Sequence, residues 1–231
     1  MSDILLIHGS CHGAWCWEPV IAALATLGHR ARAIDLPGRG GGMVTLDDQA
    51  DAIVAALDRP SLIVGHSAGG YAITAAAERD ASRITGLVYL CAYLPVSGRS
   101  LADMRRAFPS QPLLPAIRRS DDRHSFYFDA ALARNLLYHD CPPDVATGAI
   151  ARLCAEPVAP QETAIILQAS PDLPRYYIRC TADRAIPPEY QAQMAAGLPA
   201  NAVSDLAAGH SPFLAAPQQL AGRLAQILLN M

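Results

Sequence analysis

Short apolar runs alternate with segments of helical spacing along most of this chain. Four runs are typical of β-strands: Ile4–His8, Arg32–Asp35, Leu62–Gly65 and Ile84–Leu90. The last run shows no alternation of apolar and polar residues, as expected of a strand buried on both faces. Segments of helical spacing separate the runs, over residues 20–27, 46–57 and 68–79. This rhythm predicts an α/β fold, with a mostly parallel central sheet flanked by helices.

A local signal marks the start of the second helix. Thr45 is followed three residues later by Asp48, and an apolar helical pattern begins at Leu46. Such a pair predicts a capping box, in which each side chain accepts a hydrogen bond from the other residue's backbone amide. The helix is therefore expected to begin directly after Thr45.

The rhythm stops between about Leu94 and Leu173, where proline, arginine and aromatic residues become frequent. We expect a small helical cap that is inserted at about 94–173 and covers the top of the sheet, within one domain spanning 1–231. The rhythm then resumes, with predicted strands at Tyr176–Cys180 and Val203–Leu206. A helix is expected near Tyr190–Ala196, and a closing amphipathic helix enters through Pro217.

Composition narrows the range of partners. The 231 residues are 52% hydrophobic, and the net charge is only −3. This balance gives no electrostatic reason to expect nucleic acid or an anionic membrane as a partner. No apolar run approaches the roughly 20 residues needed to span a bilayer. The sequence begins without a basic segment or cleavage site, which favours a cytoplasmic location.

Two residue counts restrict the chemistry. The six cysteines show neither a C-x-x-C pair nor the spacing of metal ligands, so we expect buried free thiols and no metal site. All 18 basic residues are arginine, because the chain contains no lysine. This excludes a P-loop lysine, a Schiff-base lysine and a lysine general base.

A candidate nucleophile lies in Gly65-His66-Ser67-Ala68-Gly69, which matches G-x-S-x-G. The pattern alone is weak, because a glycine-rich turn can carry an incidental serine. Here it follows a predicted strand and precedes a predicted helix, the setting of a nucleophile elbow. The sharp turn exposes the serine in strained backbone geometry, and the helix N-terminus favours developing negative charge. We therefore predict Ser67 as the catalytic nucleophile.

A nucleophilic serine needs a base, and His210 is the best candidate. Gly209-His210-Ser211 falls between the last predicted strand and the closing helix, where a loop returns over the carboxyl edge of the sheet. A solvent-exposed loop histidine is the alternative interpretation of His210. The resulting chain order is nucleophile, acid, histidine, the order expected for this type of site.

The acid should lie between the serine and the histidine, on a loop after a strand. Asp183 follows the predicted strand Tyr176–Cys180, and can orient the imidazole and stabilise its charged form. Asp172 is expected to precede this strand, and Asp205 to lie inside the next one. Asp35 precedes the serine, which gives the wrong order. An ordinary turn carboxylate is the alternative interpretation of Asp183.

An oxyanion hole would complete the site. One donor is expected to be the backbone N–H of Ala68, directly after the nucleophile. The second is expected to be the N–H of Ser10, in the loop after the first strand. A tight loop that only supports the serine turn is the alternative interpretation of residues 8–13.

These residues carry a resemblance to a known family. The chain resembles the α/β-hydrolase subfamily that contains plant methylesterases, plant hydroxynitrile lyases and related bacterial esterases. The resemblance extends over almost the whole chain, through the segments at 8–15, 35–38, 65–70, 177–183 and 209–210. The segment at 137–141 also resembles bacterial esterases of this group. The resemblance implies a core sheet with a small helical cap, catalysis by Ser67, His210 and Asp183, and no cofactor.

Two departures from the family favour an esterase over a lyase. Hydroxynitrile lyases of this type carry a threonine where this chain has Gly9, and a lysine just after the catalytic histidine. Here the second position is Ser211, so a cationic group to hold departing cyanide is missing. Gly9 also leaves room beside the nucleophile for a tetrahedral carbon.

The expected activity is that of a serine-dependent carboxylesterase acting on small, largely apolar or aromatic esters through an acyl-enzyme. Aromatic residues in the insertion motivate this substrate, although their other interpretation is the core of the cap. Alternatively, the same fold could catalyse the hydrolysis of a lactone, an amide or a C–C bond, or the cleavage of a cyanohydrin. A further alternative is a non-catalytic small-molecule receptor. A homodimer is also compatible with the sequence. The candidate substrate-binding residues are Gly9, Cys11, Tyr93, Phe126, Phe128 and Phe213.

Overall fold

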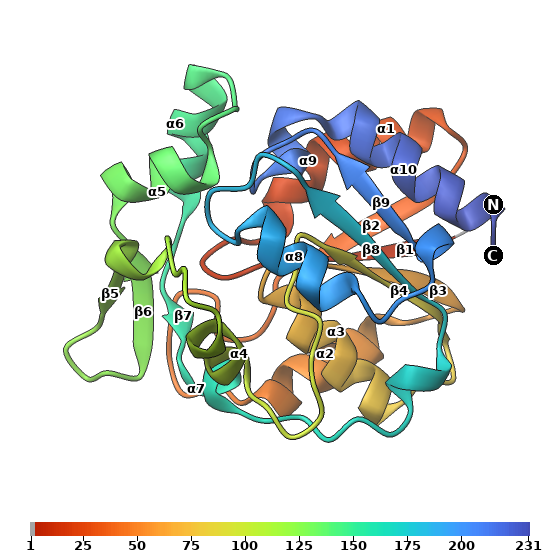
Figure 1. Cartoon of the computed structure of the whole chain (residues 1–231), viewed down its shortest axis with the longest axis horizontal. Coiled ribbons are helices and arrows are strands. Elements are labelled where there is room, and N and C mark those ends of the chain that lie inside the picture. Colours follow the sequence, from red (N-terminus) through yellow and green to blue (C-terminus); the bar gives the residue numbers. More distant parts are fainter. Residues whose placement is uncertain (1–2) are drawn as a thin grey trace.

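A parallel sheet of six strands forms the centre of the molecule in a computed structural model that describes residues 3–231 (Figure 1). Along the sheet the strands follow the order β2-β1-β3-β4-β8-β9. The chain first moves from β1 to one side and then returns to the other side with β3. Loops after β1 and β3 therefore diverge at the carboxyl edge, where ligand sites of open α/β sheets form. The strands are β1 Asp3–Ile7, β2 Arg30–Ile34, β3 Ser61–His66, β4 Ile84–Leu90, β8 Arg175–Cys180 and β9 Val203–Leu206.

Helices cover both faces of this sheet (Figure 1). On one face, α1 (Glu18–Thr26) packs against α10 (Pro217–Leu229). On the other, α2 (Leu46–Ala56) packs against α3 (Gly69–Arg79), and α8 (Pro188–Ala195) covers β8. Successive residues of one strand enter different cores: Leu5 and Ile7 face α2 and α3, whereas Ile4 and Leu6 face α1 and α10. This alternation explains why the central strands are apolar throughout.

The predicted α/β fold is confirmed by this architecture. Each predicted strand and helix of the sheet is present within about two residues of its expected ends. The capping box at Thr45 is also present, because Asp48 N donates to Thr45 Oγ1 at 3.1 Å and Thr45 N donates to Asp48 Oδ2 at 2.8 Å. Local sequence signals were therefore sufficient to predict the central sheet and the helices that cover it.

The segment between β4 and β8, residues 91–174, is here called the cap segment. Its middle part, drawn in green, lies at the left end of Figure 1, whereas its last residues, drawn in teal, run along the lower side to the opposite end. Its assignment to an insertion at 94–173 stays a prediction. A three-stranded antiparallel sheet, β5-β6-β7, accompanies its helices, and the sequence did not predict it. These strands have two to four residues each, too few for alternation to be recognised. The elements are α4 Leu101–Ala107, η2 Leu114–Ala116, β5 Ile117–Arg119, β6 Ser125–Phe128, α5 Ala130–Leu137, α6 Pro143–Arg152, β7 Glu156–Pro157, α7 Ala159–Glu162 and η3 Ser170–Asp172.

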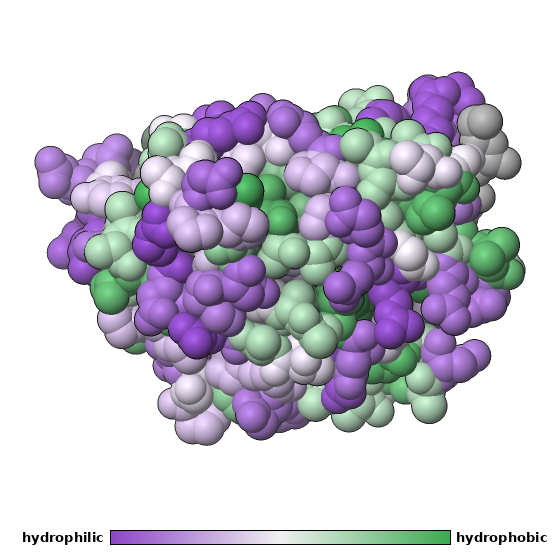
Figure 2. Space-filling model, turned by 90° about the horizontal axis from the view of Figure 1, so that it is seen from above, coloured by the Kyte–Doolittle hydropathy of each residue, from purple (hydrophilic) through white to green (hydrophobic). Residues whose placement is uncertain are grey.

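Short elements complete the chain near the sheet. A 3-10 helix, η1 (Ala14–Trp17), follows the β1 loop, and η4 (Ala200–Ala202) leads into β9. After β9, α9 (Pro212–Ala215) precedes the closing helix. On the face drawn in Figure 2, polar and apolar residues are interspersed, and most large apolar side chains are buried in the cores.

The cysteines are free thiols, as expected, but not all of them are buried. Cys11, Cys16, Cys91 and Cys180 are buried, whereas Cys141 and Cys154 are partly exposed. Within residues 3–231, no helix combines the length and the apolarity needed to cross a bilayer.

A buried carboxyl joins the cap segment to the loop after β1. Glu156 of β7 is only 5% exposed, and its Oε2 accepts a hydrogen bond from Cys11 N at 3.1 Å. The backbone supports the same junction, because Cys154 N donates to Cys11 O at 3.0 Å. Burial raises the pKa of the Glu156 carboxyl to about 8, so the side chain is protonated in the folded protein at neutral pH.

This raised pKa predicts a specific pH dependence of stability. The folded state holds a proton on Glu156 that the unfolded chain releases near the ordinary value of 4.5. The free energy of unfolding should therefore lose roughly 1 kcal/mol per pH unit from this group between pH 4.5 and about 8. In Glu156→Gln that loss should be absent, so the variant gains stability relative to wild type as the pH rises. Denaturant unfolding at a series of pH values measures the difference between the two proteins.

Glu162→Gln provides the matched control for this measurement. Glu162 belongs to the same segment, but its side chain is 52% exposed and pairs with Arg119 at 3.3 Å. The free energy of unfolding of Glu162→Gln should stay within about 0.5 kcal/mol of the wild-type value across the same pH range. If the difference in unfolding free energy between Glu156→Gln and wild type were equally independent of pH, the Glu156 carboxyl would already be ionised in the folded protein.

Candidate active site

Ser67 lies on the turn between β3 and α3, with backbone geometry that serine rarely adopts. Its φ is +53°, in the left-handed region. The turn is held from both sides, since Ser67 N donates to Leu90 O at 3.2 Å and Ser67 O accepts from Tyr93 N at 3.1 Å. A Cβ at Gly65 would lie 2.6 Å from Gly69 O, so only glycine lets the strand and the helix approach this closely. The turn thus presents the Ser67 hydroxyl at the carboxyl edge of the sheet.

A chain of hydrogen bonds joins Ser67, His210 and Asp183. His210 Nε2 lies 3.1 Å from Ser67 Oγ, and His210 Nδ1 lies 2.8 Å from Asp183 Oδ2. All three residues are buried, with 8%, 2% and 5% of their surfaces exposed. The three come from the loops after β3, β9 and β8, which meet at one edge because the strands are parallel. His210 can therefore accept a proton from Ser67 while Asp183 fixes the orientation of the ring.

The Asp183 carboxylate is held by its own surroundings. Oδ1 accepts hydrogen bonds from Ala185 N at 2.7 Å and Ile186 N at 3.0 Å. Oδ2 accepts from His210 and from Gln191 Nε2, the latter at 2.9 Å. Gln191 is completely buried, and its Oε1 accepts from Cys180 N at 2.8 Å. Gln191 could not be recognised from the sequence, because nothing in the helical pattern of α8 distinguishes it from a surface glutamine.

Two backbone amides beside Ser67 are free to bind a ligand. Neither Ser10 N nor Ala68 N donates a hydrogen bond to any part of residues 3–231. The Ser10 side chain is held in place, because its Oγ accepts from Gln161 Nε2 at 3.1 Å. Both residues line the cavity next to Ser67. Amides so placed can stabilise negative charge on an oxygen bound at Ser67.

Two neutral histidines form hydrogen bonds with the loops that carry Ser10 and His210. Burial lowers the pKa of His12 to about 3, and it lowers the pKa of His66 well below its ordinary value. His12 Nδ1 donates to Ser10 O at 2.9 Å, which leaves Nε2 to accept from the Tyr138 hydroxyl at 2.7 Å. His66 Nε2 donates to His210 O at 2.8 Å. Both rings therefore position the neighbouring backbone without carrying charge.

One group of side chains has the spacing of metal ligands within the described residues. Atoms of His66, Cys91 and His210 lie within 4.8 Å of one another. However, both ring nitrogens of His210 are already hydrogen-bonded to Ser67 and Asp183, and His66 Nε2 is bonded to a carbonyl. A metal ion would have to displace Ser67 or Asp183 from His210, so the arrangement fits proton transfer better than metal binding.

A cavity of about 470 Å³, including its mouth, opens above Ser67. Tyr93, Phe126 and Phe128, which the sequence suggested as substrate-binding residues, line it. The cavity wall is mainly apolar. Arg105 and Gln161 add polar groups to it, and neither residue was predicted from the sequence as a substrate-binding residue. The remaining apolar wall residues are Leu101, Leu113, Ile117, Leu137 and Ile186.

The other suggested substrate-binding residues lie outside this cavity. Cys11 is fully buried in the core of the cap segment, and Phe213 packs behind the site between Trp17 and His66. Neither side chain lines the wall, because the β1 loop and α9 each turn it toward a core instead. Gly9 borders the nucleophile: a Cβ there would lie 2.8 Å from both Ser67 Cβ and His66 Nδ1. The absence of a side chain at Gly9 thus leaves space beside Ser67, and Gly9 has no side chain with which to contact a ligand.

Comparisons with known proteins agree with this geometry. Methylesterase 2 of Arabidopsis thaliana is 27% identical over 252 residues, covering 98% of this chain and 95% of the relative. The pyrethroid hydrolase of Sphingobium wenxiniae is 29% identical over 246 residues, covering 97% and 87%. The crystal structure of a pyrethroid hydrolase from Sphingobium faniae JZ-2 superposes with a TM-score of 0.83 at 27% identity, covering 98% of this chain and 96% of that one. The resemblance to plant methylesterases and bacterial esterases is therefore confirmed.

The sequence pattern of the alpha/beta hydrolase family matches residues 4–223, from the first central strand into the closing helix. The matched region contains the whole six-stranded sheet except the first residue of β1, and it includes Ser67, Asp183 and His210. This chain belongs to the alpha/beta hydrolase family.

Proposed function

We propose that this chain is a serine-dependent carboxylic ester hydrolase of the carboxylesterase type. The observation that carries the proposal is the buried chain of hydrogen bonds from Ser67 through His210 to Asp183, beside two unoccupied backbone amides. The esterases among the relatives support the same reaction class. The bulk of the cavity wall is apolar, which fits small, largely apolar or aromatic esters.

In the proposed reaction, Ser67 Oγ attacks the ester carbonyl carbon while His210 Nε2 takes its proton. The carbonyl oxygen becomes an oxyanion, and the amides of Ser10 and Ala68 stabilise it. When the tetrahedral intermediate collapses, His210 returns the proton to the departing alcohol, which leaves an acyl-enzyme on Ser67. His210 then removes a proton from water, and the resulting hydroxide attacks the acyl carbon. When the bond from this carbon to Ser67 Oγ breaks, His210 returns the proton to Oγ and the carboxylic acid leaves.

The nucleophile assignment predicts the effect of Ser67→Ala. The change leaves the fold intact but removes the attacking oxygen, so kcat should fall by about 10⁴-fold or more. Hydrolysis of p-nitrophenyl acetate and butyrate by the purified, folded proteins measures this loss.

Ser61→Ala is the matched control for that experiment. Ser61 begins the same strand β3 at its opposite end, and its Oγ donates to Arg59 O at 3.0 Å, away from the cavity. Its kcat should stay within about threefold of wild type. Full turnover by Ser67→Ala would move the reaction to another group, whereas saturable binding of esters without turnover would favour a receptor.

The acid assignment predicts a difference between two aspartates. Asp183→Asn leaves an amide beside His210 Nδ1 and favours the wrong ring tautomer, so kcat should fall by roughly 10²- to 10⁴-fold. Asp205→Asn is the control, because Asp205 is exposed on β9 and pairs with Arg179 at 2.7 Å. Its kcat should remain near that of wild type in the same ester assay. Equal losses in the two variants would contradict the role given to Asp183.

A further inference from the structure

One permanently charged side chain lies in the wall of the cavity above Ser67. This residue, Arg105 of α4, is surrounded there by apolar, hydroxyl, amide and imidazole groups. Its Nε is buried and has no hydrogen-bond partner within residues 3–231. A buried donor without an acceptor costs free energy, typically about 1–3 kcal/mol and more for a charged group. The position therefore calls for an acceptor that the described part of the chain does not supply.

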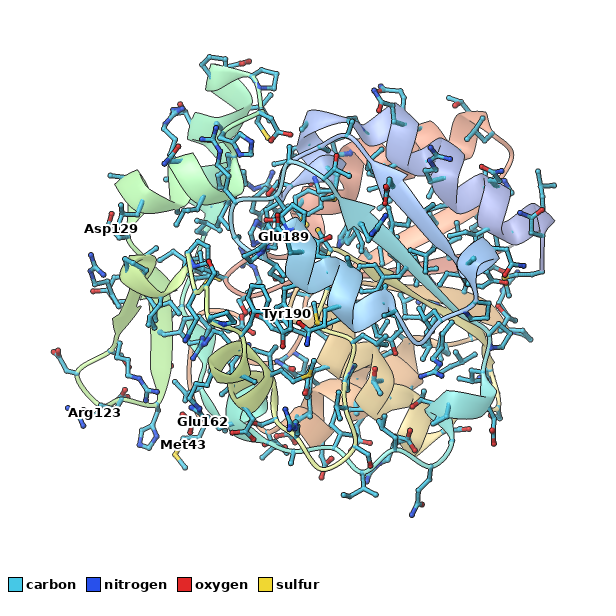
Figure 3. The ribbon with its side chains drawn as sticks, in the orientation of Figure 1. Met43, Arg123, Asp129, Glu162, Glu189 and Tyr190 are labelled. Carbon is cyan, nitrogen blue, oxygen red and sulfur yellow. The ribbon has the colours of Figure 1, made fainter. Side chains whose placement is uncertain are left out.

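Two arginines near Arg105 each form an ion pair with a carboxylate. Arg106, the next residue, pairs with Asp103 at 2.7 Å, and Arg119 pairs with Glu162 at 3.3 Å. Figure 3 shows Glu162 at the outer side of α7, away from the sheet. The ion pairs among residues 3–231 do not include Arg105. Arg105 thus lines the cavity without an ion pair to any residue in 3–231.

The helix that carries Arg105 is held firmly. Ser100 and Asp103 form a capping box at its start. Tyr190 of α8 lies beside α4 (Figure 3), and its hydroxyl donates to Met104 O at 2.7 Å. The Tyr190 ring also stacks on Phe108, at 4.3 Å between centroids. These contacts fix α4 on both sides of Arg105 and thereby hold the backbone of this residue beside the cavity.

The space around Arg105 suits a ligand with one charged end. Tyr93 and Arg105 both line the cavity above Ser67. An adjoining hollow shares Arg105, Ile117, Phe126 and Gln161 with this cavity. The apolar residues Leu101, Ile117 and Phe126 accompany the guanidinium in the cavity wall. A short apolar body could lie against them between Ser67 and Arg105.

We propose that Arg105 binds a carboxylate of the substrate, so the preferred ester carries an anionic group at the far end of a short apolar body. The half-ester of a linear dicarboxylic acid has this chemistry. A guanidinium matches a carboxylate through two parallel hydrogen bonds, which are strengthened in an apolar, partly closed site. This inference rests on the ester hydrolysis proposed above and specifies its substrate class.

The test compares charged and neutral esters of equal length. The charged series is monomethyl succinate, glutarate, adipate, pimelate and suberate; the neutral series is methyl esters of unbranched acids with the same numbers of carbon atoms. In wild type, at least one half-ester should exceed its neutral counterpart in kcat/KM by about 10-fold or more. Arg105→Met keeps the length of the side chain but removes its charge. It should lower kcat/KM for that half-ester by about 10- to 100-fold, and change the neutral ester by less than about threefold.

Arg106→Met is the matched control, because it removes an exposed arginine from the next position of the same helix. It should leave the ratio between half-ester and neutral ester unchanged. If neutral esters are hydrolysed with dependence on Ser67 but half-esters are never preferred, or Arg105→Met does not affect the preference, the inference is overturned and the proposed function stands.

A binding measurement separates this inference from the catalytic proposal. Isothermal titration of Ser67→Ala with the same half-esters should show binding that Arg105→Met, added to that variant, weakens by about 10-fold or more. This outcome would support the carboxylate site even if no ester were turned over, in which case only the proposed function would fail. Equal binding to both proteins would overturn the inference.

Discussion

The strained turn at Ser67 is the constraint on which the rest of the site depends. A serine with φ of +53° costs free energy, and the surrounding structure must hold it in place. Here the constraint comes from the β4 end and the loop that follows it, through Leu90 O and Tyr93 N. Gly65 permits the close approach of β3 and α3 that makes the turn this sharp. Ser67, the nucleophile in our proposal, is thus positioned by backbone contacts of three central segments and not by its own side chain.

Around that turn, the protein uses neutral imidazoles as structural hydrogen-bonding groups. Desolvation lowers the pKa values of His8, His12 and His66, so each ring offers one donor and one acceptor. His8 Nε2 accepts from Leu36 N at 3.0 Å, and thereby joins the loops after β1 and β2. His66 joins the nucleophile turn to the loop of His210. These rings connect the loops around Ser67 and His210 without placing extra positive charge beside His210.

The cap segment contributes polar groups to the cavity and to the loop after β1. Gln161 holds the Ser10 side chain, and Glu156 binds the Cys11 amide in the same loop. Arg105 adds a permanent charge to a wall that is mainly apolar. In our proposal, the loops after the sheet strands therefore supply the reacting groups, whereas the cap segment shapes the loop that borders them and selects the substrate.

The sequence by itself determined the layers of the fold, and it pointed to Ser67, His210 and Asp183, which the structure brings together at one edge of the sheet. Strands buried on both faces leave continuous apolar runs, and a sharp strand–turn–helix leaves glycines around Ser67, so both are visible locally. Parallel strands also bring their following loops to one edge, which is why chain order pointed to Asp183 and His210. Only the tertiary structure decided which side chains line the cavity. Cys11 and Phe213 turn into cores, whereas Arg105 and Gln191 acquire their places from contacts between segments distant in sequence. The strands of the cap segment are too short to carry a pattern of their own, since long-range pairing rather than local preference forms them.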